Sequence, residues 1–188
     1  ALRILLGLTA LSLAPALMIV MTSFTRIIVV LAILRQALGM QQTPPNQVLI
    51  GLALFLTLFS MGPVLEKVNR DALQPFMEEQ IDAAAAFDLG MAPMRDFMIR
   101  QTGESDLEVM YEVAKRPAPK SVEEVSSLIL IPAFLLSELK MAFQIGFVIF
   151  LPFVLIDIVV ASLLMSMGML MVPPMMLSLP IKTVSYTH

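Results

Sequence analysis

Ser137-Glu138-Leu139-Lys140 leads into thirty-two residues, Met141 to Val172, whose single charged side chain is Asp157, and Pro173-Pro174 follows. A helix needs about 20 apolar residues to cross a bilayer core, so this stretch is long enough to span a membrane. As a straight helix it would be about 48 Å long, which exceeds the roughly 30 Å core. We therefore expect an integral membrane protein in which this block is kinked, tilted or folded as a hairpin near Asp157 or Gly168.

The composition supports this expectation. Apolar residues make up 58% of the chain and the mean hydropathy is +0.86, whereas soluble domains are roughly 45–50% apolar. Residues 66–124 differ from the rest, because they contain 13 acidic and 7 basic side chains. The sequence thus predicts three parts: N-terminal hydrophobic helices (1–65), an acidic soluble helical insert (66–124) and a C-terminal hydrophobic helical block (125–188). The insert has few of the clustered basic residues that hold loops in the cytoplasm, so we expect it to be periplasmic.

Helix signals are frequent, and no stretch alternates as a strand would, which predicts an all-α fold. Leu2 to about Met21 is expected to form a first helix, although Ala14-Pro15-Ala16 also resembles a signal-peptide cleavage site. A second helix should end at Gly39. Asn46 is expected to cap a third helix that continues to Leu65.

Several function classes are poorly supported. The chain has no cysteine, and its one histidine is His188. It therefore lacks the commonest general base and the usual soft metal ligands, and it has no phosphate-binding glycine loop. The acidic insert argues against nucleic acid as a partner, because phosphates need a basic face. We expect neither an enzyme nor a bound cofactor.

Four of the charged residues that lie in or beside apolar blocks are candidate functional residues: Arg26, Glu138, Lys140 and Asp157. Glu138 and Lys140 are two positions apart, so they point to different sides of a helix and cannot pair with each other. Either each has a partner on another helix or subunit, or both are hydrated at a membrane interface.

For the other two charged residues, Arg26 and Asp157, the sequence also leaves more than one role open. Arg26 follows the hydroxyl residues Thr22, Ser23 and Thr25, and it either pairs with a neighbouring charge or extends to the membrane interface. Asp157 is a proton relay, an inter-subunit anchor or part of a solvated turn.

The ordered motifs of the chain resemble one family. They are Met21-Thr22-Ser23-Phe24-Thr25-Arg26, Leu34-Arg35-Gln36-Ala37-Leu38-Gly39, Pro44-Pro45-Asn46-Gln47, Ser137-Glu138-Leu139-Lys140 and Pro152-Phe153-Val154-Leu155-Ile156-Asp157. Together with Met167-Gly168-Met169 before Val172-Pro173-Pro174, they are similar to the FliP family of export-gate proteins in flagellar and injectisome type III secretion. The similarity extends from about Leu2 to Lys182. By this comparison the chain starts within the first mature helix, and its polar end after Lys182 departs from the family pattern.

The resemblance implies a function that composition does not. Several copies of such a chain assemble with FliQ and FliR and contact other export-apparatus membrane proteins. They form the portal for unfolded flagellar proteins, as multi-pass proteins of the bacterial inner membrane in the flagellar basal body.

The resemblance also implies roles for particular residues. Six of the sixteen methionines lie between Met165 and Met176, and flexible methionine side chains adapt to irregular gaps. By the family pattern Met169, Leu170 and Met171 are the pore gasket. Glu138 and Lys140 are inter-subunit contacts, and Phe143 and Phe147 pack in the assembly.

One alternative from a different class remains. A proton-coupled membrane carrier would use Glu138 and Asp157 as relay acids, and it would need a midplane cavity between broken helices.

Overall fold

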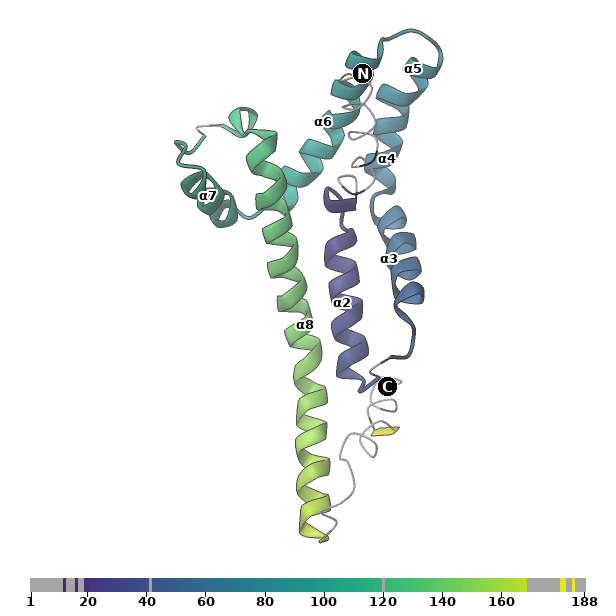
Figure 1. Ribbon diagram of the computed structural model, residues 1–188, viewed down its shortest axis with the longest axis vertical. Coiled ribbons are helices and arrows are strands. Elements are labelled where there is room, and N and C mark those ends of the chain that lie inside the picture. The colour runs from purple at the N-terminus through teal and green to yellow at the C-terminus, as the bar shows by residue number, and fades with distance from the viewer. Residues whose placement is uncertain are drawn as a thin grey trace. The chain divides into compact units, whose positions relative to one another are not determined.

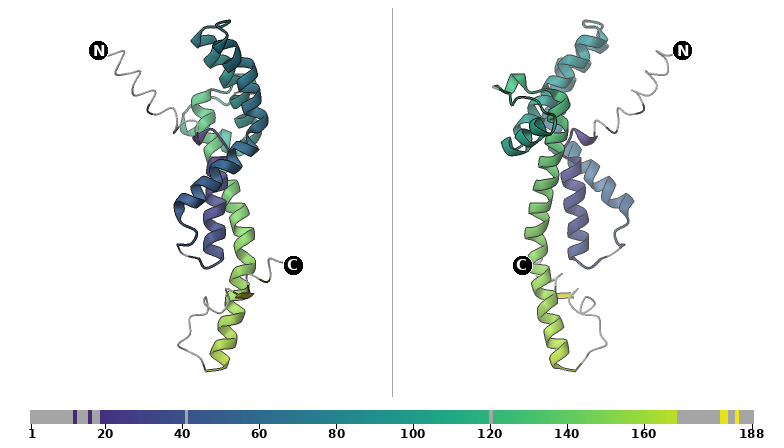
Figure 2. Two further views of the ribbon diagram at one scale, coloured as in Figure 1. Left: turned by 90° about the vertical axis from the view of Figure 1, so that its right-hand side faces the viewer. Right: turned by 60° about the vertical axis from the view of Figure 1, so that its left-hand side comes forward.

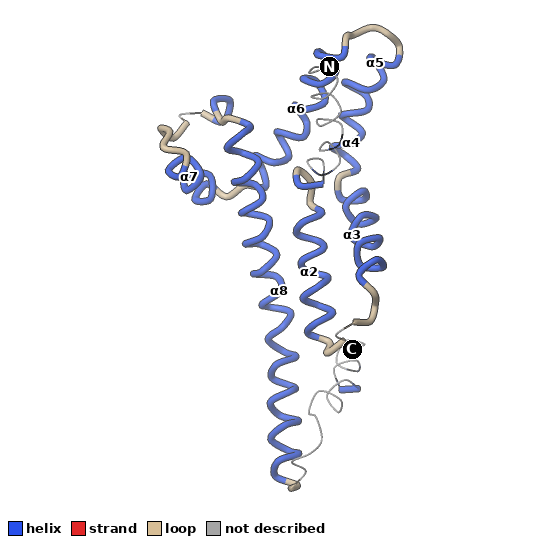
Figure 3. The backbone as a smooth tube through the Cα atoms, in the orientation of Figure 1, coloured by secondary structure: helices blue, strands red, loops and turns tan. Residues whose placement is uncertain are grey.

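The computed structural model describes Ser12, Ala16 and residues 19–40, 42–119, 121–168, 180–181 and 184. In this part of the chain every regular element is helical (Figure 3), which confirms the predicted all-α fold. The expected first helix, Leu2 to about Met21, lies almost wholly outside the described residues. Contacts group the chain into two compact units. Unit 1 contains Ala1–Arg26 and Leu54–Lys140, and unit 2 contains Ile27–Ala53 and Met141–His188.

Unit 1 is built mainly from short helices that fold back on one another. The elements with residues in it are the start of α2 (Phe24–Ala37), the C-terminal half of α3 (Asn46–Ser60), α4 (Gly62–Val68), the π-helical turn η1 (Asn69–Leu73), α5 (Gln74–Met77), α6 (Ala83–Gln101), α7 (Glu104–Val113), the 3₁₀ turn η2 (Val122–Glu124) and the start of α8 (Ser127–Ser166). The helix from α4 through α5 runs beside α6 (Figures 1 and 2).

The third helix ends earlier than the sequence predicted. We expected it to continue to Leu65, but α3 ends at Ser60, and the helical segment that begins at Gly62 is bent from it by 64°. Pro63 lies in the first turn of α4. Proline has no backbone N–H to donate, and its fixed φ suits the first turn of a helix, where that N–H would have no partner.

α6 is a continuous helix across Gly90 and Pro93. The Asp82 side chain caps it by accepting a hydrogen bond from Ala85 N at 2.8 Å. α6 packs against η1 at Gly90, where a Cβ would lie 3.5 Å from Ala72 Cβ, an ordinary van der Waals contact.

Methionine dominates the buried core of unit 1. The core residues are Met21, Met61, Met94, Met98, Val125, Leu130 and Phe134. Phe97 packs edge-on against Phe134 with ring centroids 5.8 Å apart. Met94 and Met98 lie on one face of α6, so this core joins α6 to the start of α8.

Unit 2 contains most of α2 (Phe24–Ala37), the first half of α3 and the rest of α8. Gly39 ends α2 as predicted, with φ of 75° and a hydrogen bond from Met40 N to Arg35 O. The predicted cap is wrong: Asn46 is itself the first residue of α3, and its side-chain oxygen accepts from Arg35 Nη1 at 2.8 Å.

α8 is one helix of 40 residues, so the alternative of a hairpin near Asp157 is wrong. Pro132 and Pro152 lie within it and are exposed. The helix ends before Gly168, which has φ of 76° and whose N–H bonds to Met165 O. Glycine adopts this left-handed conformation without strain, which explains why the helix ends here.

Candidate functional site

Six polar side chains from four helices meet on α8 in unit 1. We call this group the polar clamp; its members are Arg26, Gln101, Asp106, Ser137, Glu138 and Lys140. They come from the start of α2, the end of α6, the first turn of α7 and one turn of α8. The clamp therefore fixes the corner between α6 and α7 to the Ser137-Glu138-Leu139-Lys140 segment.

Arg26 and Glu138 form the buried half of the clamp. Arg26 Nε donates to Glu138 Oε2 at 2.9 Å, and Arg26 Nη2 donates to Oε1 at 2.6 Å. Arg26 Nη2 also donates to Gln101 Oε1 at 2.9 Å. The Glu138 side chain is completely buried and that of Arg26 is 21% exposed. A two-pronged pair of this kind fixes both position and orientation of the two helices.

Asp106 is the centre of the other half. Ser137 Oγ donates to Asp106 Oδ2 at 2.7 Å and accepts from Gly103 N at 3.0 Å. Lys140 Nζ donates to Asp106 Oδ1 at 3.2 Å, although the Lys140 side chain is 52% exposed. The hydrogen bond from Ser137 lowers the pKa of Asp106, Lys140 adds to this effect, and loss of hydration opposes it.

The clamp gives Glu138 and Lys140 separate partners within this chain, as their spacing requires. Glu138 pairs with Arg26 on α2, whereas Lys140 pairs with Asp106 on α7. Sequence reasoning did not single out Gln101, Asp106 or Ser137. The available signal was weak: Asp106 lies in the first turn of a helix, and Ser137 directly precedes an acid in an apolar block.

The other predicted residues lie apart from the clamp. Asp157 is half-buried within α8 in unit 2, next to the face that buries Phe153 and Val160. Phe143 and Phe147 are 61% and 65% exposed. Met169, Leu170 and Met171 lie outside the described residues.

Arg95 is a further structural residue that the sequence analysis did not single out. It donates to the carbonyl oxygens of Val122 and Glu123 at 3.0 and 3.2 Å, and to Ser127 Oγ at 3.4 Å. The guanidinium group thus joins α6 to the turn that precedes α8.

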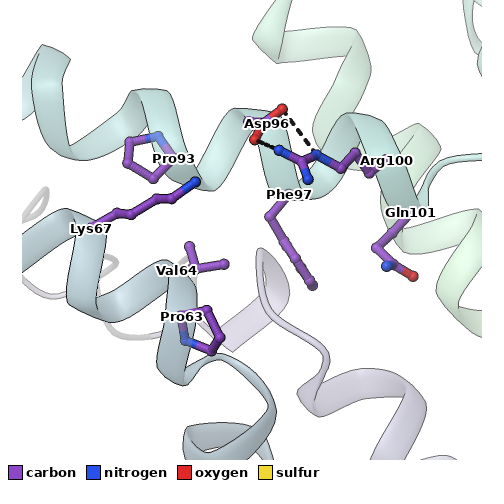
Figure 4. A pocket seen from close by; sticks show the side chains of 8 residues that line it. All are labelled: Pro63, Val64, Lys67, Pro93, Asp96, Phe97, Arg100 and Gln101. Atoms are coloured by element: carbon purple, nitrogen blue, oxygen red, sulfur yellow. Dashed lines mark hydrogen bonds and ion pairs between the residues drawn. The ribbon is translucent and has the colours of Figure 1, made fainter.

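A cleft with a volume of about 220 Å³ lies between α4 and α6 (Figure 4). Its lining includes Lys67, Asp96, Phe97, Arg100 and the clamp residue Gln101. Arg100 pairs with Asp96, and its hydrogen bond lowers the pKa of that carboxyl. In the described part of the chain no three acidic, histidine or cysteine side chains are grouped as a metal site. The side chains that line the cleft can hold α4, α6 and the clamp in position relative to one another.

Comparison with known proteins gives one consistent result. The family model described as "FliP family" matches residues 7–187. The chain is 54% identical over 175 residues to the flagellar biosynthetic protein FliP of Pectobacterium carotovorum, which covers 93% of this chain and 68% of that protein. It is 50% identical over 180 residues to FliP of Bacillus subtilis (96% and 81% covered). It is 48% identical over 182 residues to FliP of Aquifex aeolicus (96% and 76% covered).

Proposed function

Since the chain belongs to the FliP family of flagellar biosynthetic proteins, we propose that it is a core channel subunit of the flagellar type III export apparatus. Several copies form, with FliQ and FliR, the gated portal through which unfolded flagellar proteins are secreted. The family is a component of flagellar export and is not an enzyme family.

The observation that carries this proposal is the uncovered apolar surface of α8. Phe143 and Phe147 are one helical turn apart and both mostly exposed. The same side of the helix continues with the exposed residues Leu151, Leu155 and Ile158. Contiguous apolar surface of this extent marks a contact with protein or membrane. In the proposed assembly, partner subunits and lipid would cover this surface.

A membrane location is supported by α8 itself. It is long and apolar enough to cross a bilayer, and the bent pair of α3 with the following helices counts as a second candidate if it is one span. We propose a multi-pass protein of the bacterial inner membrane within the flagellar basal body. The acidic insert would lie on the periplasmic side.

In this proposal the clamp and the gasket have different tasks. The clamp holds the base of α8 against α2, α6 and α7, so the helix enters the assembly in one orientation. The gasket would be Met169, Leu170 and Met171, whose flexible side chains would close around a passing polypeptide.

The proton-coupled carrier is less well supported. It needs Glu138 to take up and release a proton, yet both carboxylate oxygens accept hydrogen bonds from Arg26. The family relationship favours protein export instead.

The test is disulfide crosslinking in cells, which this cysteine-free chain suits. Cysteines should replace Phe143 and Phe147, because Glu138 is buried in its own ion pair and a cysteine there would disrupt the fold. Ala142→Cys is a matched control on the same helix, since Ala142 is fully buried. A disulfide joins two cysteines, so we expect a disulfide-linked dimer of two copies, and adducts with FliQ or FliR molecules that themselves carry a cysteine, from the two phenylalanine positions only. Membrane-inserted protein that yields no adduct from either position would contradict the proposal.

A further inference from the structure

The helical stretch from the end of α4 to α5 and the first half of α6 line an apolar groove in unit 1 with a volume of about 330 Å³. We call it the tip groove; it is lined by Val68, Ala72, Leu73, Phe76, Ala83, Ala86, Phe87 and Gly90. Phe76 is 44% exposed and Phe87 is 67% exposed. The groove lies in the acidic insert, where apolar side chains open to water usually mark a binding surface.

Acidic residues are close in sequence to the residues that line the tip groove. Glu78, Glu79 and Asp82 lie in the turn between α5 and α6, and Asp88 follows Phe87; all four are exposed. The nearest preceding cation, Arg70, is already paired with Asp71 at 2.7 Å. An apolar groove beside acidic side chains favours, as its binding partner, an apolar segment that carries unpaired basic groups.

This chain contains such a segment directly after α7. Val113 is 71% exposed, and the exposed cations Lys115 and Arg116 follow it. Among the described residues neither cationic side chain has a hydrogen bond or ion pair. Residues 113–116 therefore present an apolar side chain beside two unpaired positive charges, which is the chemistry complementary to the tip groove.

The segment is placed to reach a neighbour and not its own groove. The groove lies along the first half of α6, whereas residues 113–116 follow the opposite end of that helix through α7 (Figure 1). Only the part of α6 after Gly90 separates them: residues 91–101 extend about 16 Å at 1.5 Å per residue.

We propose that residues 113–116 of one copy bind the tip groove of the next copy in the assembly. Val113 enters the apolar lining, and Lys115 and Arg116 face Glu79 and Asp88. The contact joins two different surfaces, so it repeats from copy to copy and builds a ring or an open helical array. This inference rests on the proposed multi-copy assembly and specifies one of its contacts.

The test uses two differently tagged full-length copies in the same cells. One copy carries Val113→Cys and the other carries Phe87→Cys. We expect a mixed disulfide dimer that contains both tags. Leu128→Cys is the matched control for Phe87→Cys, because Leu128 is an exposed apolar residue of the same unit, 81% exposed, and it lies outside the groove.

Charge exchange separates a direct contact from a structural effect. Lys115→Glu with Arg116→Glu should lower the dimer yield roughly tenfold, because like charges then oppose each other. Glu79→Lys with Asp88→Lys in the other copy should restore it. Restored yield supports the proposal, and a yield that stays low in the exchanged pair overturns the charge contact.

The two proposals fail in different ways. If Phe143→Cys forms disulfide-linked dimers while the Val113 and Phe87 cysteines give no mixed dimer, the assembly stands and the tip-groove contact is overturned. If neither combination gives an adduct, both proposals fall.

Discussion

Arg26 and Glu138 are 112 residues apart in the sequence, yet two nitrogens of one side chain bind both oxygens of the other. The carboxylate is fully buried. Removing one member of such a pair leaves an uncompensated buried charge, which costs roughly 3–5 kcal/mol. The pair therefore stabilises the fold only when α2 and α8 are correctly placed against each other.

We predict that Arg26→Ala, which leaves the fully buried Glu138 carboxylate without its cation, lowers the stability of the purified full-length chain by about that amount. Arg26→Lys should be intermediate, because lysine keeps the charge but cannot form the two-pronged contact. Thermal unfolding in detergent measures both. Arg70→Ala is the control: its ion pair with Asp71 is exposed, so stability should barely change. Equal losses in all three variants would contradict the assigned role of the pair.

The second prediction concerns pH. The pKa of Asp106 is lowered in the folded chain, first by the bond from Ser137. Its stabilising contribution is thus present above the unfolded carboxyl pKa of about 4 and is lost as the pH falls through the lower folded value. Asp106→Asn should be less stable than the parent at pH 7, and the difference should shrink below about pH 4. Melting temperatures between pH 3 and pH 7 test this.

A matched control for Asp106 is Glu123→Gln, since the Glu123 side chain is exposed. This variant should track the parent at every pH. A difference for Asp106→Asn that is constant across the whole range would show that the group stabilises the fold by packing and not by its charge.

The third prediction concerns Arg95. Arg95→Ala should loosen the turn before α8, because two backbone carbonyls lose their donor. We expect faster protease cleavage between residues 114 and 126, with little change in the protection of α6. Arg95→Lys should recover part of the protection. Unchanged cleavage in Arg95→Ala would contradict the proposed restraint.

The sequence predicted the helical class and the end of the second helix at Gly39. The spacing of Glu138 and Lys140 predicted only that they do not pair with each other. Helix ends are harder to predict. α6 continues across Gly90, a residue of low helix propensity, at a point where it packs against η1. Tertiary contact outweighs local propensity at this position.

The clamp illustrates what a single sequence does not provide. Glu138 was recognisable as an acid that needs a partner, but its partner lies on α2 and is distant in sequence. Asp106 was one acid among many in the insert. Only the packing of α7 against α8 brings it to Ser137 and Lys140. Pairing across helices depends on the three-dimensional arrangement, which periodicity alone does not specify.

The last prediction concerns the contact between α2 and α8 in unit 2. A Cβ on Gly146 would overlap Ile33 Cδ1 and lie 3.1 Å from Ile33 Cγ2. The helices approach closely because glycine is present, as is usual where small residues pack in membrane helices. Gly146→Leu should destabilise the chain by roughly 1–3 kcal/mol through overpacking. Ile33→Ala in the same chain should restore much of the loss, because it removes the atoms that clash.

Gly51→Ala is the control for that experiment, since nothing lies within 4 Å of a Cβ placed there. Alanine in a helix interior is favoured over glycine by about 0.5–1 kcal/mol, so this variant should be equal to the parent or slightly more stable. The coupling between positions 33 and 146 is measured from the unfolding of four proteins: the parent, Gly146→Leu, Ile33→Ala and the double variant. Additive effects would show that the two residues do not determine the helix approach. A double variant that is clearly more stable than Gly146→Leu alone would show that they do.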